Sequence, residues 1–186
     1  MKNVPNILSV IRAVLSIAVL VLIVTVDPAT QKMAFIFGPG LLFLIAAVTD
    51  TLDGQIARRK NLVSDFGKFI DPIADKILTT FAVLGFLYID ADGGRPILLI
   101  NLAVTLLREF SIASLRMMAA KGGVVIAADW AGKVKTVLQM VAIGSYFFFT
   151  ATDFVWIAQA LLVIATVMTV LSGALYMKNY FRSAKS

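Results

Sequence analysis

Four aspartates in the first half of the chain are spaced so that they could hold metal ions. Asp50 and Asp53 lie about one turn apart in one predicted helix, and Asp71 and Asp75 lie one turn apart in the next. Ligation by carboxylates alone favours Mg²⁺, Mn²⁺ or Ca²⁺ over zinc. Pairs of such ions recur in enzymes that catalyse displacement at phosphorus, so the spacing predicts a two-metal site. The four carboxylates would balance the charge of two divalent ions.

An ion-pair network is the alternative interpretation of these aspartates. Arg58, Lys68 and Lys76 are close to them in the sequence and could pair with some of them. The chain contains no histidine and no cysteine, which excludes a Ser-His triad, a thiol nucleophile, a disulfide and any metal site built on those side chains. Proton transfer would therefore depend on a carboxylate, a lysine or a tyrosine.

The elements that carry these residues are predicted to be membrane helices. Hydrophobic residues make up 60% of the 186-residue chain, whereas soluble domains are about half apolar. A spanning helix needs about 20 mainly apolar residues, so the chain has room for six spans and little else. We expect an all-α, polytopic membrane protein with a single domain over residues 1–186. The expected helices are 6–26, 35–59, 66–89, 95–120, 130–150 and 154–180.

The placement of lysine and arginine predicts the orientation of the spans. Most basic residues flank one side, whereas Lys32 and Arg95 lie on the other side together with several acidic residues. Both termini and the aspartates are therefore expected on the cytoplasmic side of the cell (inner) membrane. The net charge of +6 suits a bilayer with anionic headgroups. Because this charge is spread along membrane-flanking segments, no nucleic-acid partner is expected.

The residues around the aspartates resemble the signature of the CDP-alcohol phosphatidyltransferase family. The matching pattern is Asp50-x2-Asp53-Gly54-x2-Ala57-Arg58-x8-Gly67-x3-Asp71-x3-Asp75. The resemblance implies transfer of a phosphatidyl group from a CDP-linked lipid to a small alcohol.

The same resemblance implies roles for individual residues. Asp50, Asp53 and Asp71 would ligate two ions, Mg²⁺ or Mn²⁺. Asp75 would complete the shell of the second ion and take the proton of the acceptor. The residues assigned to the CDP-diacylglycerol site are Asn6, Gly54, Arg58, Ser64 and Gly67. For the glycines, close packing of membrane helices is the alternative explanation.

Three other segments resemble the phosphatidylglycerophosphate synthase branch of this family, whose acceptor is sn-glycerol 3-phosphate. These segments are Asn3-Val4-Pro5-Asn6, Arg108-Glu109 and Gly132-Lys133-Val134-Lys135-Thr136. A phosphate dianion needs cationic donors. The candidates are Arg108, Arg116, Lys133 and Lys135.

These cations have structural explanations as well. Lys133 and Lys135 could anchor the cytoplasmic end of a helix. Arg108 could form a local pair with Glu109 or pair with a residue of another helix, although neighbouring residues point apart on a helix, which makes the adjacent Glu109 an unfavourable partner.

Other functions remain as alternatives. A cation transporter also carries carboxylates in membrane helices, but segments 15–24 and 41–48 contain no ionisable group that would continue a path. A non-catalytic scaffold leaves the cost of clustered carboxylates unexplained. Within the enzyme class, a related phosphatidyltransferase would use inositol phosphate or serine. The family resemblance also allows a homodimer.

Overall fold

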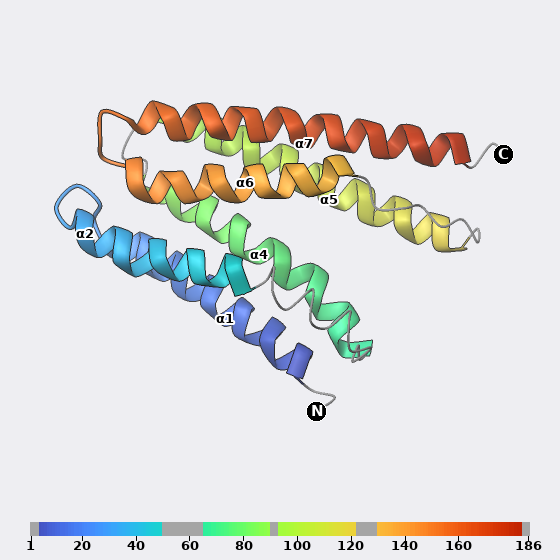
Figure 1. Cartoon of the computed structure of the whole chain (residues 1–186), viewed down its shortest axis with the longest axis horizontal. Coiled ribbons are helices and arrows are strands. Elements are labelled where there is room, and N and C mark those ends of the chain that lie inside the picture. Colours follow the sequence, from blue (N-terminus) through green and yellow to red (C-terminus); the bar gives the residue numbers. More distant parts are fainter. Residues whose placement is uncertain (1–3, 50–64, 90–92, 122–129, 184–186) are drawn as a thin grey trace.

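The computed structural model describes residues 4–49, 65–89, 93–121 and 130–183, and these residues form helices joined by short turns (Figure 1). No strand occurs within these ranges. The long helices are α1 (Val4–Thr25), α4 (Asp65–Ile89), α5 (Arg95–Lys121), α6 (Trp130–Phe149) and α7 (Val155–Ser183). These bounds agree closely with five of the six expected helices.

The second helical segment differs in its first turns from the regular α-helix expected over 35–59, of which residues 50–59 lie outside the described ranges. It begins with α2 (Lys32–Phe35), passes through a π-helical turn, η1 (Ile36–Gly40), and continues as an α-helix over 41–49. In this turn the Leu41 N–H donates to the Ile36 carbonyl, five residues earlier. Pro39 inside the turn has no N–H to donate, which interrupts the regular α-helical ladder and accounts for the wider turn.

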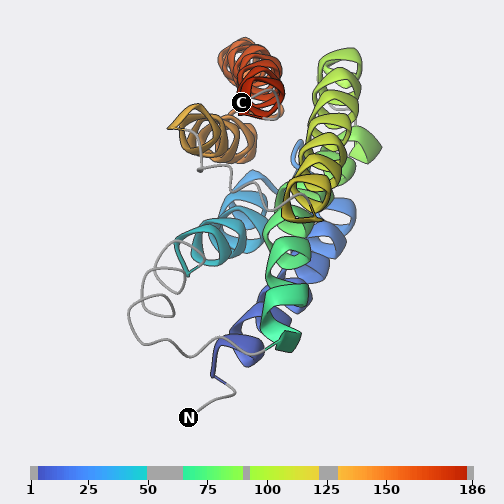
Figure 2. The ribbon, with the colours of Figure 1, turned by 90° about the vertical axis from the view of Figure 1, so that its right-hand side faces the viewer.

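The helices form two groups that meet at one end of the molecule. α4 packs along α1, while α5 and α6 both pack along α7. Figure 2 shows α6 and α7 as a layer separate from α1 and α4. Successive helices run in opposite directions, so that α1 begins and α7 ends at the same end of the molecule, where the two groups diverge (Figure 1).

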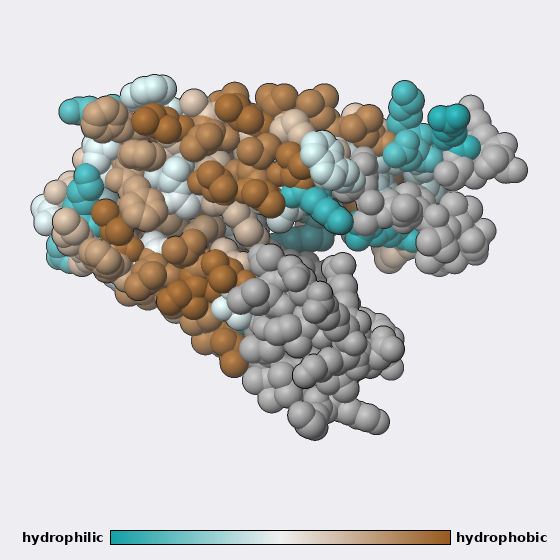
Figure 3. Space-filling view, viewed as in Figure 1, coloured by the Kyte–Doolittle hydropathy of each residue, from teal (hydrophilic) through white to brown (hydrophobic). Residues whose placement is uncertain are grey.

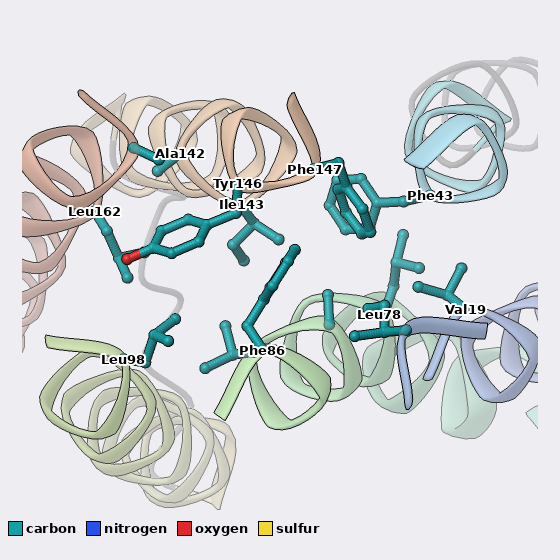
Figure 4. Close-up of a cluster of buried hydrophobic side chains, with 14 of the residues drawn as sticks. Val19, Phe43, Leu78, Phe86, Leu98, Ala142, Ile143, Tyr146, Phe147 and Leu162 are labelled. Carbon is teal, nitrogen blue, oxygen red and sulfur yellow. The ribbon is translucent and has the colours of Figure 1, made fainter. Parts of the chain in front are cut away.

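An aromatic cluster joins the two groups (Figure 4). The ring of Phe86, from α4, lies 4.9 Å from the ring of Phe147 and 5.1 Å from that of Tyr146, both from α6. Phe43, from the second helical segment, lies 5.3 Å from Phe147. All four residues are buried. Edge and tilted ring contacts at these distances stabilise packing beyond the burial of apolar area.

Close approach of α1 and α4 depends on a glycine. A Cβ atom at Gly85 would lie 2.8 Å from Cγ2 of the buried Ile23. Any larger residue at this position of α4 would therefore push the two helices apart, which is the usual reason for small residues between membrane helices.

The outer surface is that of a membrane protein. Large apolar side chains are exposed along every long helix, and Figure 3 shows hydrophobic surface over the middle of the molecule and hydrophilic surface toward its ends. Three helical segments in the described ranges are long and apolar enough to cross a bilayer: Lys32–Thr49, Arg95–Ala119 and Val155–Arg182. The chain is thus an all-α membrane protein.

Candidate functional site

The carboxylate of Glu109 is the centre of an ion cluster to which three helices contribute. Its Oε1 accepts from Nη1 of Arg108, its neighbour on α5, at 2.8 Å, and from Nζ of Lys135 on α6 at 3.0 Å. Its Oε2 lies 3.1 Å from Nζ of Lys76 on α4. We call these four residues the Glu109 cluster. Hydrophilic surface is present in Figure 3 below the N-terminal end of α6, next to the hollow that separates the two helix groups.

The Glu109 cluster has more positive than negative charge. Within the part of the chain whose side chains are described, it contains three cations and one anion, and Lys135 is only 5% exposed. The side chains of Arg108 and Glu109 are each 15% exposed, whereas that of Lys76 is 43% exposed. An uncompensated charge is costly when it is removed from water. The excess therefore favours binding of an anion at this place.

The pair between Arg108 and Glu109, which the sequence allowed as an unfavourable local contact, does form. Their Cα–Cβ bonds do diverge, as in any helix. The arginine side chain, however, is long enough for its guanidinium to reach the adjacent carboxylate at 2.8 Å. The direction of the Cα–Cβ bonds therefore does not prevent a pair between neighbours when one of them is an arginine.

Two glycines leave space for Arg108. A Cβ atom at Gly132 of α6 would lie 3.4 Å from its Nη2, and one at Gly173 of α7 would lie 3.2 Å from its Cγ. The Nε of Arg108 is buried, and among the described residues it has no hydrogen-bond partner. The guanidinium is thus held between three helices, with donor capacity beyond its bond to Glu109.

Arg116 and Lys133 lie outside the Glu109 cluster. Nε of Arg116 is 3.4 Å from the hydroxyl of Tyr176, and its guanidinium lies 5.7 Å from the centre of that ring, within the range of a cation–π contact. Lys133 is exposed on α6, two residues before Lys135, and residues at that spacing do not share a helix face. Of the four predicted phosphate ligands, the structure brings together Arg108 and Lys135.

Sequence reasoning did not identify Lys76 and Glu109 as members of this site. Lys76 was considered only as a partner for the aspartates, and Glu109 only as a poor partner for Arg108. Glu109 and Lys135 are 26 residues apart, so no helical periodicity relates them. α5 and α6 both pack on α7, and this arrangement brings Glu109 and Lys135 together.

The predicted metal and CDP-lipid residues are described in part. Asn6 lies on α1, and Gly67, Asp71 and Asp75 lie on α4, where the two aspartates are one turn apart and Lys76 directly follows Asp75. The remaining predicted residues lie outside the described ranges: Asp50, Asp53, Gly54, Arg58 and Ser64.

Polar contacts continue from the Glu109 cluster along α5. One turn before Glu109, the hydroxyl of Thr105 accepts from Nε2 of Gln139 on α6 at 3.3 Å. One turn earlier still, Nδ2 of Asn101 donates to the hydroxyl of Thr166 on α7 at 2.8 Å. Hydrogen bonds of this kind between membrane helices fix which residues face one another.

The sequence is similar to proteins of one family over nearly its whole length. The family model described as CDP-alcohol phosphatidyltransferase matches residues 2–171. A protein of Bacillus subtilis (strain 168), named CDP-diacylglycerol--glycerol-3-phosphate 3-phosphatidyltransferase, is 36% identical over 151 residues, which cover 78% of this chain and 75% of the relative. A protein of the same name from Rickettsia typhi is 34% identical over 190 residues, which cover 100% and 99%. A probable phosphatidylglycerophosphate synthase of Mycobacterium tuberculosis (strain H37Rv) is 35% identical over 141 residues, which cover 76% and 65%.

Proposed function

Because this chain belongs to the CDP-alcohol phosphatidyltransferase family, we propose that it transfers the phosphatidyl group of CDP-diacylglycerol to sn-glycerol 3-phosphate. The products are phosphatidylglycerophosphate, an intermediate of phospholipid synthesis, and CMP. Relatives from Bacillus and Rickettsia carry the name of this reaction. Inositol phosphate and serine remain the alternative acceptors within the family.

The observation that supports a phosphate-bearing acceptor is the positive charge of the Glu109 cluster. Among the described side chains, three cations surround one carboxylate and leave two positive charges, which match the charge of a phosphate dianion. Arg108 keeps donors that are not used by Glu109, and Lys135 presents an ammonium group from a buried position. Serine, which has no phosphate, would not use such a site. Arg116 and Lys133 would contribute at its margin.

The aspartates supply the other half of the proposed site. Members of this family generally depend on a divalent metal. We assign two ions, Mg²⁺ or Mn²⁺, to Asp50, Asp53, Asp71 and Asp75, because an all-carboxylate donor set suits these metals and because Asp71 and Asp75 are one turn apart on α4. The chemistry that bound ions supply is neutralisation of the pyrophosphate and of the charge that develops on CMP.

The residues of the chain bind, orient and deprotonate the substrates. A hydroxyl oxygen of the acceptor attacks the β-phosphorus of the CDP-lipid, the bond to the CMP phosphate breaks, and CMP leaves with the electron pair. Asp75 takes the proton of the attacking hydroxyl, since an alcohol is a poor nucleophile without a base. The residues that hold the CDP-lipid are Asn6, Gly54, Arg58, Ser64 and Gly67.

We place this reaction at the cytoplasmic face of the cell membrane. The proposal rests on the excess of lysine and arginine beside the aspartate-bearing helices. In this arrangement the chain crosses the membrane six times as a single domain, residues 1–186, with both termini in the cytoplasm. The acyl chains of the donor stay in the bilayer while the water-soluble acceptor arrives from the cytoplasm. A homodimer is a further prediction from the family resemblance.

The direct test is an acceptor panel. Purified protein is incubated with radiolabelled CDP-diacylglycerol, Mg²⁺ or Mn²⁺, and one of sn-glycerol 3-phosphate, inositol 1-phosphate, serine or glycerol, and the lipid product is identified. An Asp75→Asn preparation, purified in parallel, controls for host enzymes that copurify. We expect phosphatidylglycerophosphate as the main product. Preference for any other alcohol would overturn the acceptor assignment and leave the family assignment in place.

A further inference from the structure

We propose that Glu109 is a positioning residue, which holds Arg108 and Lys135 in the arrangement that binds the phosphate of the acceptor. The inference rests on the proposed function. Glu109 does not itself attract an anionic substrate. Its role follows from its ion pairs with the three cations around it.

Without a counterion the three cations would not stay together. Each comes from a different helix: Lys76 from α4, Arg108 from α5 and Lys135 from α6. Like charges in a partly dehydrated site repel one another strongly because little water screens them. Lysine and arginine also have long, flexible side chains, and in a membrane protein these turn toward headgroups or water when nothing retains them. By binding all three cations, the Glu109 carboxylate offsets their mutual repulsion and keeps their side chains from turning toward headgroups or water.

The carboxylate retains the cations without using all their hydrogen-bond donors. Arg108 donates to it through Nη1, and this bond uses one of the five N–H donors of the guanidinium. Lys135 has three ammonium hydrogens, and one hydrogen bond to Glu109 leaves others for a ligand. Glu109 therefore holds hydrogen-bond donors in place before the phosphate of the acceptor binds. This lowers the entropy cost of ordering these side chains on binding.

Glu109 also connects the phosphate-binding side chains to the helix that carries the proposed base. Lys76, bound to Oε2, directly follows Asp75 in α4. α4 packs mainly on α1, whereas α5 and α6 pack on α7, so this ion pair joins the two helix groups. The hydroxyl of the acceptor must reach the β-phosphorus while the acceptor's phosphate is bound to the Glu109 cluster. A fixed distance between this cluster and the base therefore assists both binding and attack.

The packing of α5 rests on contacts besides those of Glu109. The Thr105–Gln139 and Asn101–Thr166 hydrogen bonds fix α5 against α6 and α7 within two turns. Leu98, on the same helix, is buried in the hydrophobic core. Removing the charge of Glu109 should therefore change the site and preserve the fold, which makes the proposal testable by substitution.

The test compares Glu109→Gln, which has the same shape and no charge, with Thr105→Val, which breaks the neighbouring polar contact. For both full-length variants, kcat and KM are measured for sn-glycerol 3-phosphate and for CDP-diacylglycerol, and turnover of glycerol is measured at a fixed concentration. For Glu109→Gln we expect kcat/KM for sn-glycerol 3-phosphate to fall by about tenfold or more. We also expect an unchanged KM for CDP-diacylglycerol and a weaker preference for sn-glycerol 3-phosphate over glycerol.

Thr105→Val should lower thermal stability and leave the preference between the two acceptors unchanged. An equal loss of preference in Thr105→Val, or wild-type acceptor kinetics in Glu109→Gln, would overturn the positioning role. If Glu109→Gln does not elute as a folded protein, Glu109→Asp replaces it, because the shorter side chain keeps the charge but cannot reach all three cations. The same selective loss is then expected, and its absence overturns the proposal. Failure of the wild-type enzyme to use sn-glycerol 3-phosphate would instead refute the proposed function.

Discussion

Replacing Arg108 by lysine should impair use of the acceptor although the charge is kept. In the structure, Nη1 of Arg108 donates to Glu109 at 2.8 Å, and no described residue accepts a hydrogen bond from the buried Nε. Lysine has a single ammonium group, which cannot contact Glu109 and also present the planar pair of donors that fits two phosphate oxygens. The space between Gly132 and Gly173 matches the longer arginine side chain.

The size of the effect follows from the contacts that are lost. The Arg108 side chain is 15% exposed, so its hydrogen bonds are largely shielded from water. Loss of one charged hydrogen bond costs about 1.5–3 kcal/mol. This range corresponds to a loss of about ten- to hundredfold in kcat/KM for sn-glycerol 3-phosphate. The KM for CDP-diacylglycerol should not change, because the proposed donor site uses other residues.

The assay varies sn-glycerol 3-phosphate at saturating CDP-diacylglycerol, and then reverses the roles of the two substrates. Arg95→Lys is the matched control, since Arg95 begins the same helix at its other end and should tolerate the change. Wild-type kcat/KM in Arg108→Lys would refute the reasoning about geometry. A rise confined to the KM of CDP-diacylglycerol would show that Arg108 binds the donor instead.

Four further outcomes are expected. Excess EDTA should abolish activity, and Mg²⁺ or Mn²⁺ should restore it; full activity in EDTA would contradict the two-metal site. Asp75→Asn should stop turnover while CDP-lipid binding, measured by calorimetry, persists, because the amide keeps the shape and cannot act as the base. In separate Lys2→Cys, Ser186→Cys and Asp92→Cys variants, a membrane-impermeant thiol reagent should label the first two from the cytoplasmic side and the third from the opposite side. Gly85→Leu should lower the thermal unfolding midpoint, because overpacking costs about 1–3 kcal/mol, and an unchanged midpoint would show that α1 and α4 can separate without loss.

Hydrophobic patterning predicted the helices well because each membrane helix must satisfy its own backbone. The expected ranges 66–89 and 95–120 correspond to α4 (Asp65–Ile89) and α5 (Arg95–Lys121). The π-helical turn was missed, since a Gly-Pro-Gly sequence indicates an irregularity and does not specify its type. The boundaries of a helix depend on residues that are close together in the chain, so they can be predicted from the sequence.

The composition of the acceptor site was predictable only in part. Arg108 and Lys135 were identified because charged side chains in membrane helices are costly and usually have a function. Their common partner Glu109 was not, because the distance between α5 and α6 depends on packing far from the site. The glycines that accommodate Arg108 show the same limit: Gly173 is 65 residues away in the sequence, and only the packing of α7 on α5 relates the two.

The pairing of Arg108 with its neighbour also matters for how the protein is made. A nascent membrane protein delivers its helices in order, so α5 is complete before α6 and its Lys135 have been synthesised. A charged residue near the centre of an inserting helix costs about 2.5–3.5 kcal/mol. The Arg108–Glu109 pair, with its atoms 2.8 Å apart, lies within a single helix and exists as soon as α5 forms. α5 can therefore enter the bilayer as a locally neutral segment, and Lys135 joins the same carboxylate oxygen when the next helix arrives.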